Sequence, residues 1–247
     1  MTTLFMGISV CSSAPRVSSP PTAAVILTSL SCASLGLKSH DTKVYYIMQM
    51  VSIMQYLRSR SYLHRDLKPA NLLLNEKFQL VLSDFGTAVQ INQPEELQLR
   101  KTKSHACLNQ ALCGVDYAEE LVGTQEYISP EALARNQKLT FGNDLWSLGV
   151  IVWQMYSREN RTPFEAGTAE ETSRNILNCD YKMPDGDDVT AEVRDLIARL
   201  LVPDAEKRLG ADCFSKLMAH QLFCGRSFDA LYESEPHLPT RLRKLTK

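Results

Sequence analysis

The chain has almost no excess charge of either sign, because 27 Lys and Arg residues stand against 28 Asp and Glu residues. Proteins that bind nucleic acid electrostatically concentrate positive charge, so we expect no nucleic-acid partner. Apolar runs long enough to span a membrane are also absent: the apolar segment 23–37 is interrupted by Ser and Thr and has no basic segment before it. We therefore expect neither a membrane span nor a secretory signal.

Paired cysteines are absent as well. The cysteines form no CxxC motif and no cluster with histidine that would suit a metal ion. Disulfide frameworks belong mainly to small secreted proteins, so we interpret these residues as reduced thiols of a cytoplasmic protein. They are Cys11, Cys32, Cys107, Cys113, Cys179, Cys213 and Cys224.

The first 42 residues lack the features of a folded or phosphate-binding segment. They contain two glycines, Gly7 and Gly36, one lysine, Lys38, and no glutamate, so they hold no GxGxxG loop. Ser, Thr, Pro and Ala dominate, without a sustained helical or strand period. The sequence therefore predicts a disordered or non-native tail over residues 1–42.

Regular patterns begin after this stretch. The β-branched and aromatic run Lys43–Met48 predicts a strand. Apolar residues at roughly helical spacing predict a short amphipathic helix over 51–61. The runs Leu72–Leu74 and Phe78–Leu82 flank a polar turn and predict a β-hairpin.

Two further helices are indicated in the second half of the chain. Residues 144–156 are apolar on almost every side, which predicts a helix that is buried all round. An amphipathic helix begins after Thr190, a good N-cap residue, and stops near Pro203. These patterns predict an α+β fold that is mainly helical, with a small β-hairpin.

The loop 64–71, His-Arg-Asp-Leu-Lys-Pro-Ala-Asn, holds the residue types that phosphoryl transfer from ATP to a hydroxyl group requires. We assign Asp66 to orient the hydroxyl and accept its proton, and Lys68 to neutralise the transferring phosphate. We assign Asn71 and Asp84 as oxygen ligands of Mg²⁺, because the predicted hairpin between them can fold back so that both face one ion.

Three strings in a fixed order carry a family resemblance. The loop 64–71 is followed by Asp-Phe-Gly at 84–86 and by Gly-Thr-Gln-Glu-Tyr-Ile-Ser-Pro-Glu at 123–131. In this order the chain resembles the protein kinase family from about residue 43 to residue 222. The resemblance implies a protein-kinase-like large lobe, ATP and Mg²⁺ as cofactors, and proteins as substrates.

The resemblance also implies roles for residues near the loop. Lys68 and Thr124 match the serine/threonine-specific pattern, in which Thr124 bonds toward Asp66 and Lys68. Leu73 and Asp84 are expected to contact ATP together with Lys68.

Two structural roles are implied further along the chain. Asp144 is expected to anchor the backbone of the catalytic loop, and Glu131 is expected to pair with Arg208. The surrounding strings resemble the AGC group, and within it kinases that phosphorylate the activation loops of other AGC kinases. Such kinases are the implied protein partners.

One position departs from that pattern. Those relatives have a phosphorylatable serine four residues before the threonine of the 123–131 string, and this chain has Glu120. We expect Glu120 to pair with Arg65 and to order the segment without a modification. Two solvated surface charges are an equally weighted alternative. Within the activation segment 84–131, the polar stretch 90–119 is interpreted as a surface insert.

Residues 43–50 resemble the last strand of a small lobe and the hinge that binds adenine. By that match Met48, Gln49 and Met50 contact ATP. Asp66 lies only 17 positions after Gln49. A span of about 25 to 30 residues is therefore interpreted as missing, since a 20-residue helix alone is about 30 Å long.

The predicted organisation is a large lobe over 51–224 and a C-terminal tail over 225–247, with the small lobe largely absent. Two interpretations stay open. In the first, the chain is a truncated or mis-spliced kinase that binds Mg²⁺ and ATP weakly and turns over little. In the second, it is a catalytically dead fragment that acts as a binding module or decoy. The intact catalytic set favours descent from an enzyme.

Overall fold

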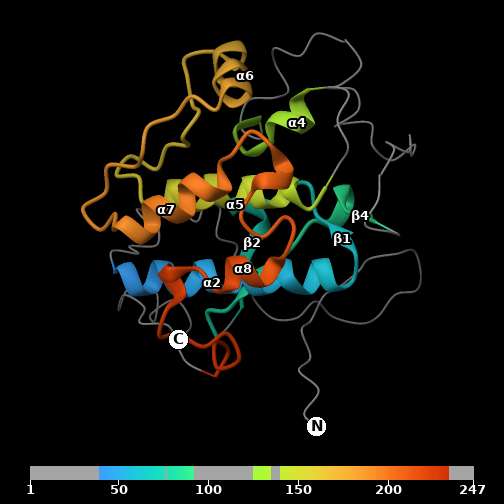
Figure 1. Ribbon diagram of the computed structural model, residues 1–247, viewed down its shortest axis with the longest axis vertical. Helices are drawn as coiled ribbons and strands as arrows, with labels where there is room; N and C mark the ends of the chain where they lie inside the picture. The colour runs from blue at the N-terminus through green and yellow to red at the C-terminus, as the bar shows by residue number, and fades with distance from the viewer. Residues whose placement is uncertain (1–38, 76, 92–124, 135–139, 234–247) are drawn as a thin grey trace.

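The computed structural model describes residues 39–75, 77–91, 125–134 and 140–233 (Figure 1). The helices are α2 (His40–Ser59), α4 (Pro130–Leu133), α5 (Gly142–Met155), α6 (Ala169–Asn178), α7 (Ala191–Leu200) and α8 (Phe214–Met218). The strands are β1 (Tyr62–Leu63), β2 (Leu72–Leu74), β3 (Leu80–Leu82) and β4 (Val89–Gln90). The 3₁₀ segments are η1 (Pro69–Asn71), η2 (Phe85–Thr87), η3 (Gln125–Tyr127), η4 (Ala205–Lys207) and η5 (Gln221–Phe223). This mainly helical arrangement with small sheets confirms the predicted α+β class.

Helix α5 forms the centre of the core. Every residue of α5 is buried, because the helix lies between α2 and α7 (Figure 1). Trp146 stacks on Phe164 with the ring centroids 5.1 Å apart. Gly149 lets α7 approach closely, since an added Cβ would lie 2.8 Å from Leu201 Cδ2. The predicted helix that is buried on all sides is confirmed.

Helix α7 covers one side of α5. The Thr190 side chain accepts a hydrogen bond from Val193 N and caps the helix, as its sequence predicts. The apolar stripe that includes Leu196 and Ile197 is fully buried. No helix in the described part of the chain is long and apolar enough to cross a membrane.

Helix α2 corrects the strand predicted for Lys43–Met48. These residues are helical, and the helix continues through the predicted helical segment to Ser59. The β-branched and aromatic composition favours a strand by less than about 1 kcal/mol per residue, which burial readily outweighs. Val44, Tyr46 and Ile47 are completely buried. Lys43 Nζ pairs with Asp188 at 2.8 Å and lies over the ring of Tyr156, so even the charged position is satisfied.

The assignment of Met48, Gln49 and Met50 to an adenine-binding hinge is therefore wrong. Their side chains are at most 2% exposed, and their backbone groups lie inside α2, where helical hydrogen bonds occupy them. The segment interpreted as missing before Asp66 needs no insertion, because α2 supplies a 20-residue helix that β1 connects to the loop. Of the predicted tail, residues 1–38 lie outside the described residues, whereas 40–42 belong to α2.

The predicted hairpin is confirmed. Strands β2 and β3 are antiparallel, with Leu72 opposite Leu82 and Leu74 opposite Leu80. At the turn, Asn75 Oδ1 accepts hydrogen bonds from Lys77 N and Gln79 N, which is a typical use of asparagine in tight turns. The second pair, β1 and β4, joins the segment before the loop 64–71 to the segment after η2.

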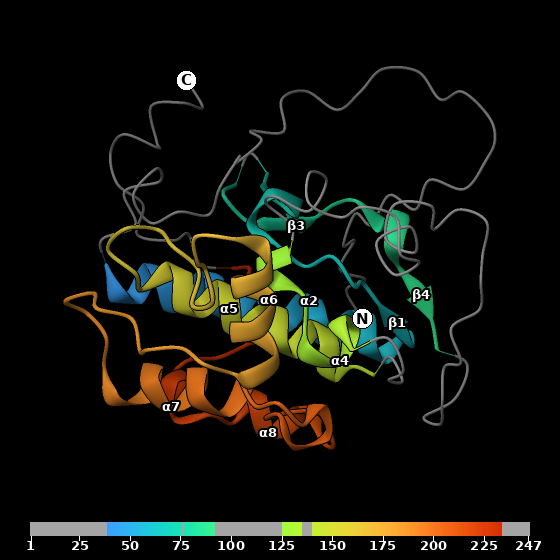
Figure 2. The same ribbon diagram turned by 90° about the horizontal axis from the view of Figure 1, so that it is seen from above.

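The hairpin and helices α7 and α8 lie on opposite sides of the layer formed by α2 and α5 (Figure 2). After η5 the chain returns to α2, where Leu231 is 3% exposed and belongs to the core. Gln79 Nε2 of the hairpin donates to Tyr232 O at 3.1 Å. The helical layer thus supports a hairpin whose first strand, β2, follows the loop 64–71 and whose second strand, β3, leads toward Asp84.

Candidate active site

The loop 64–71 is held in place by α5. Asp144 accepts hydrogen bonds from His64 N at 2.8 Å and from Arg65 N at 2.9 Å. These bonds fix Arg65 in a left-handed conformation with φ 70°, which residues other than glycine rarely adopt. Burial raises the pKa of the Asp144 carboxyl, and the two backbone bonds oppose that rise. The contact expected between Asp144 and the loop backbone is present.

Asp66, Lys68 and Asn71 come together at the end of the loop. Lys68 Nζ lies 2.8 Å from Asp66 Oδ2. Asn71 Nδ2 donates to Asp66 O at 2.8 Å and to Asp66 Oδ2 at 3.1 Å. Because an ionised carboxylate only accepts hydrogen bonds, the amide has to turn its NH₂ group toward Asp66 and its Oδ1 away. Asn71 therefore presents an oxygen that a cation can use.

Asp84 lies two residues after the end of β3 and is exposed. Its backbone is left-handed, with φ 59° and ψ 74°, and its side chain accepts a hydrogen bond from Gly86 N. The preceding residue, Ser83, donates to Asn71 O from its N–H at 2.9 Å and from its hydroxyl at 3.0 Å. The two predicted oxygen ligands thus lie on segments that are bonded directly to each other.

His64 and Thr87 connect the Asp-Phe-Gly segment to the loop. His64 Nε2 lies 3.1 Å from Ser83 O, and its ring meets Phe85 edge-on at 5.0 Å. Thr87 Oγ1 donates to His64 O at 2.9 Å, and Arg65 Nε donates to Thr87 O at 2.7 Å. Ser83 and Thr87 were not predicted as site residues. Their positions on either side of the Asp-Phe-Gly string are the signal that could have pointed to them.

The hairpin presents an apolar surface on the side opposite the core. Leu73 and Val81 face each other in register and are half-buried. Their neighbours Leu72 and Leu74 are buried in the core, as expected from the alternation of side chains along a strand. Leu73 therefore stands where a flat apolar group could pack against the hairpin.

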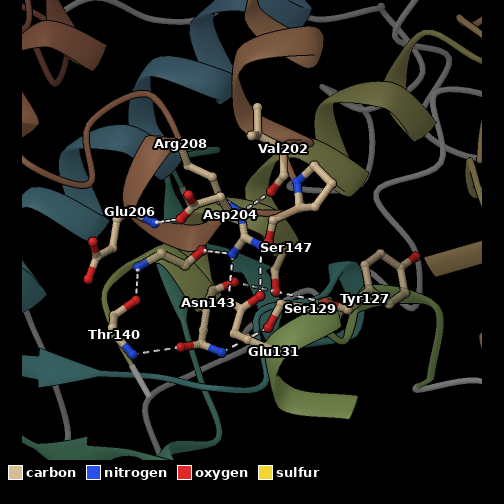
Figure 3. A network of polar contacts seen from close by, with 12 residues as sticks. Tyr127, Ser129, Glu131, Thr140, Asn143, Ser147, Val202, Asp204, Glu206 and Arg208 are labelled. Atoms are coloured by element: carbon tan, nitrogen blue, oxygen red, sulfur yellow. Dashed lines mark hydrogen bonds and ion pairs between the residues drawn. The ribbon is translucent and has the colours of Figure 1, made fainter. Parts of the chain in front are cut away.

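Glu131 and Arg208 form a buried bidentate ion pair (Figure 3). The two N–O distances are 2.6 and 2.7 Å, and the side chains are 2% and 0% exposed. Arg208 also donates to Gly142 O at 2.8 Å, which joins α4 to the first turn of α5. Nearby, Asn143 Nδ2 donates to Ser129 Oγ at 2.8 Å. The pair predicted between Glu131 and Arg208 is present.

Several predicted site residues lie outside the described residues. These are Thr124, Glu120 and the interpreted insert 90–119 apart from its first two residues. Arg65, the partner expected for Glu120, is described, and its Nε donates to Thr87 O. Burial lowers the pKa of the Arg65 guanidinium group, and the nearby charge of Asp144 opposes that shift.

Comparisons with known proteins agree with this geometry. The family model described as the protein kinase domain matches residues 26–223. The 3-phosphoinositide-dependent protein kinase 1 of Homo sapiens is 34% identical over 195 residues, which are 78% of this chain and 31% of that protein. Serine/threonine-protein kinase ksg1 of Schizosaccharomyces pombe is 35% identical over 193 residues, which cover 78% of this chain and 30% of the relative.

A plant relative shows the same extent of similarity. The 3-phosphoinositide-dependent protein kinase 1 of Arabidopsis thaliana is 32% identical over 203 residues, which are 81% of this chain and 38% of that protein. The chain therefore spans well under half the length of these relatives.

Proposed function

Because the chain belongs to the protein kinase family, we propose that it carries the catalytic large lobe of a serine/threonine kinase that phosphorylates protein hydroxyl groups with ATP. One observation carries the proposal: Asp66 Oδ2 is shared by Lys68 Nζ at 2.8 Å and Asn71 Nδ2 at 3.1 Å. This is the set of groups that in-line phosphoryl transfer requires around the acceptor hydroxyl. The likeness to the AGC group supports other AGC kinases as the protein substrates.

The two contacts on Asp66 suggest how its carboxylate works. Both fall on Oδ2, so we assign Oδ1 to the substrate hydroxyl. The hydroxyl oxygen attacks the γ-phosphorus, the bond from that phosphorus to ADP breaks, and Asp66 receives the hydroxyl proton. The Lys68 ammonium group turns from Asp66 toward the transferring phosphate and stabilises its negative charge. We assign Thr124, outside the described residues, to bond toward Asp66 and Lys68.

The residues present fit a magnesium ion. Asn71 turns Oδ1 away from Asp66, and Asp84 holds an exposed carboxylate on a segment bonded to Asn71, so both offer the oxygen ligands that Mg²⁺ prefers. When bound, the ion neutralises phosphate oxygens and orients them. For the nucleotide itself, we assign Leu73 as an apolar contact of the base, because it is half-buried on the outer face of the hairpin.

We test the proposal by substituting the two carboxylates separately in the 247-residue chain. Binding of Mn²⁺·ATP, measured by the paramagnetic relaxation of water protons, should weaken about tenfold or more in Asp84→Asn. Asp66→Asn should bind the nucleotide normally and lose phosphorylation of a protein substrate by about a thousandfold or more.

Assayed on its own, the chain should bind Mn²⁺·ATP weakly and turn over slowly, because no glycine-rich loop is found in residues 1–42. Equal binding by the parent chain and Asp84→Asn would refute the metal assignment. Binding without any phosphorylation would favour a binding module or decoy instead.

A further inference from the structure

Among the described residues, the strand that leads to Asp84 has one edge without a partner strand. In the part of the chain that the structure describes, β3 pairs only with β2. Asn75 N donates to Gln79 O across the turn, so the alternation of an antiparallel pair directs the N–H of Leu80 away from β2. Leu80 is 5% exposed, and an unsatisfied N–H at such a buried position would destabilise the hairpin.

Helix α2 satisfies this edge with two side chains. Gln49, which is completely buried, accepts the hydrogen bond from Leu80 N at 2.6 Å. One helical turn earlier, the Tyr46 hydroxyl donates to Phe78 O at 3.3 Å. An acceptor and a donor from α2 therefore bond to the edge of β3 that faces away from β2.

The far end of the same strand is bonded to the other predicted metal ligand. Ser83 donates twice to Asn71 O, so the segment from Leu80 to Asp84 is fixed at both ends. The position of the Asp84 carboxylate relative to Asn71 then depends on both attachments. Groups that hold a metal ligand in place contribute strongly to metal affinity, although they do not touch the metal.

We propose that Gln49 is a positioning residue for metal–nucleotide binding, because its buried carbonyl oxygen fixes strand β3 and so sets the position of Asp84. The inference rests on the proposed function, in which Asn71 and Asp84 hold Mg²⁺. In this inference Gln49 acts on the nucleotide site indirectly, through its hydrogen bond with Leu80 N, and does not itself touch the nucleotide.

Three variants of the full chain separate this role from general stability. Gln49→Met keeps an unbranched side chain and loses the acceptor, whereas Gln49→Glu keeps an acceptor oxygen. Gln55→Met makes the same replacement at an exposed position of α2 and serves as the matched control. Amide hydrogen exchange of residues 80–86 reports the strand, and water-proton relaxation reports Mn²⁺·ATP affinity.

We expect Gln49→Met to raise the exchange rate of the Leu80 amide at least about tenfold and to weaken Mn²⁺·ATP binding about tenfold. Gln49→Glu should retain most of the affinity, and Gln55→Met should match the parent chain in both measurements. If Gln49→Met does not fold, Tyr46→Phe, which removes only a hydroxyl group, takes its place with the same direction expected for both readouts.

Two results would overturn the inference. Faster exchange at Leu80 with unchanged Mn²⁺·ATP affinity would show that Gln49 holds the strand but does not position the site, and the proposed function would stand. Unchanged protection of residues 80–86 in Gln49→Met would also overturn it, because Gln49 would then not hold the strand. If the parent chain takes up no Mn²⁺·ATP, the metal assignment of the proposed function fails, and the positioning role that rests on it fails with it.

Discussion

At the scale of single residues, Arg208 shows how a buried charge can be fully satisfied. The residue is 1% exposed. Its guanidinium group binds both oxygens of Glu131 and donates to the carbonyl groups of Val202, Gly142 and Pro203. The same group lies 4.9 Å from the ring of Trp146. These contacts join segments that lie up to 77 residues apart in the chain.

Glu131→Gln should destabilise the protein by about 3 kcal/mol, because it leaves the buried charge of Arg208 without a counter-ion. The new amide NH₂ would also face a guanidinium NH₂ where an acceptor is required. Urea unfolding followed by tryptophan fluorescence measures the loss, since Trp146 lies against Arg208.

The matched control is Glu159→Gln. Glu159 pairs with Arg161 at the surface, where the two side chains are 68% and 65% exposed. This substitution should cost less than about 1 kcal/mol. Equal losses in the two variants would contradict the assigned importance of the buried pair.

At the scale of elements, the close approach of α5 and α7 depends on Gly149, which has no side chain. A Cβ added at Gly149 would lie 2.8 Å from Leu201 Cδ2 and 2.9 Å from Leu200 Cβ, closer than carbon atoms normally approach. Helix propensity alone favours alanine over glycine by about 1 kcal/mol in a helix interior. Packing between the two helices therefore opposes the local preference.

Gly149→Ala should destabilise the protein by about 1 to 2 kcal/mol, because overpacking outweighs the gain in helix propensity. The measurement is the midpoint of chemical unfolding followed by circular dichroism. Gly167→Ala is the control, since an added Cβ there would meet its nearest neighbour, a side-chain oxygen of Glu171, at 3.5 Å. A more stable Gly149→Ala variant would show that α7 moves away at little cost.

At the scale of the whole molecule, Asp144 couples the core to the site. The residue belongs to α5, which is buried along its whole length, and its two carboxylate oxygens hold the backbone of His64 and Arg65. The same loop is bonded through Thr87 to the segment that carries Asp84. The helical core thus determines where the loop and the metal-binding segment lie.

Asp144→Asn should loosen the loop and leave the core intact. An asparagine offers one acceptor oxygen, so one of the two backbone N–H groups would face an NH₂ group instead. Amide exchange at His64 and Arg65 should rise at least about tenfold, while α5 and α7 keep their protection. The exposed Asp180→Asn is the control, and faster exchange throughout α5 would contradict a local role.

Much of the site could be predicted from local pattern. The residue types of the loop 64–71 and the Asp-Phe-Gly string name the groups that phosphoryl transfer needs, whatever their surroundings. The turn at Asn75 predicts the hairpin, and the apolar character of 144–156 predicts a helix that is buried on every side. In each case a short stretch of sequence contains the physical cause, so no distant contact has to be known.

The sequence by itself determined the chemistry of the loop, the hairpin and the buried helix α5, whereas only the tertiary structure decided the state of residues 43–50. Their strand propensity is worth less than about 1 kcal/mol per residue, and burying one large apolar side chain contributes about 1.5 to 3 kcal/mol. Val44, Tyr46 and Ile47 reach full burial only on a helix that packs against α5 and the hairpin. Lys43 donates to Asp188, 145 residues away, and Gln49 Oε1 accepts from the N–H of Leu80, 31 residues away. No local pattern contains contacts between such distant positions, because folding alone brings them together.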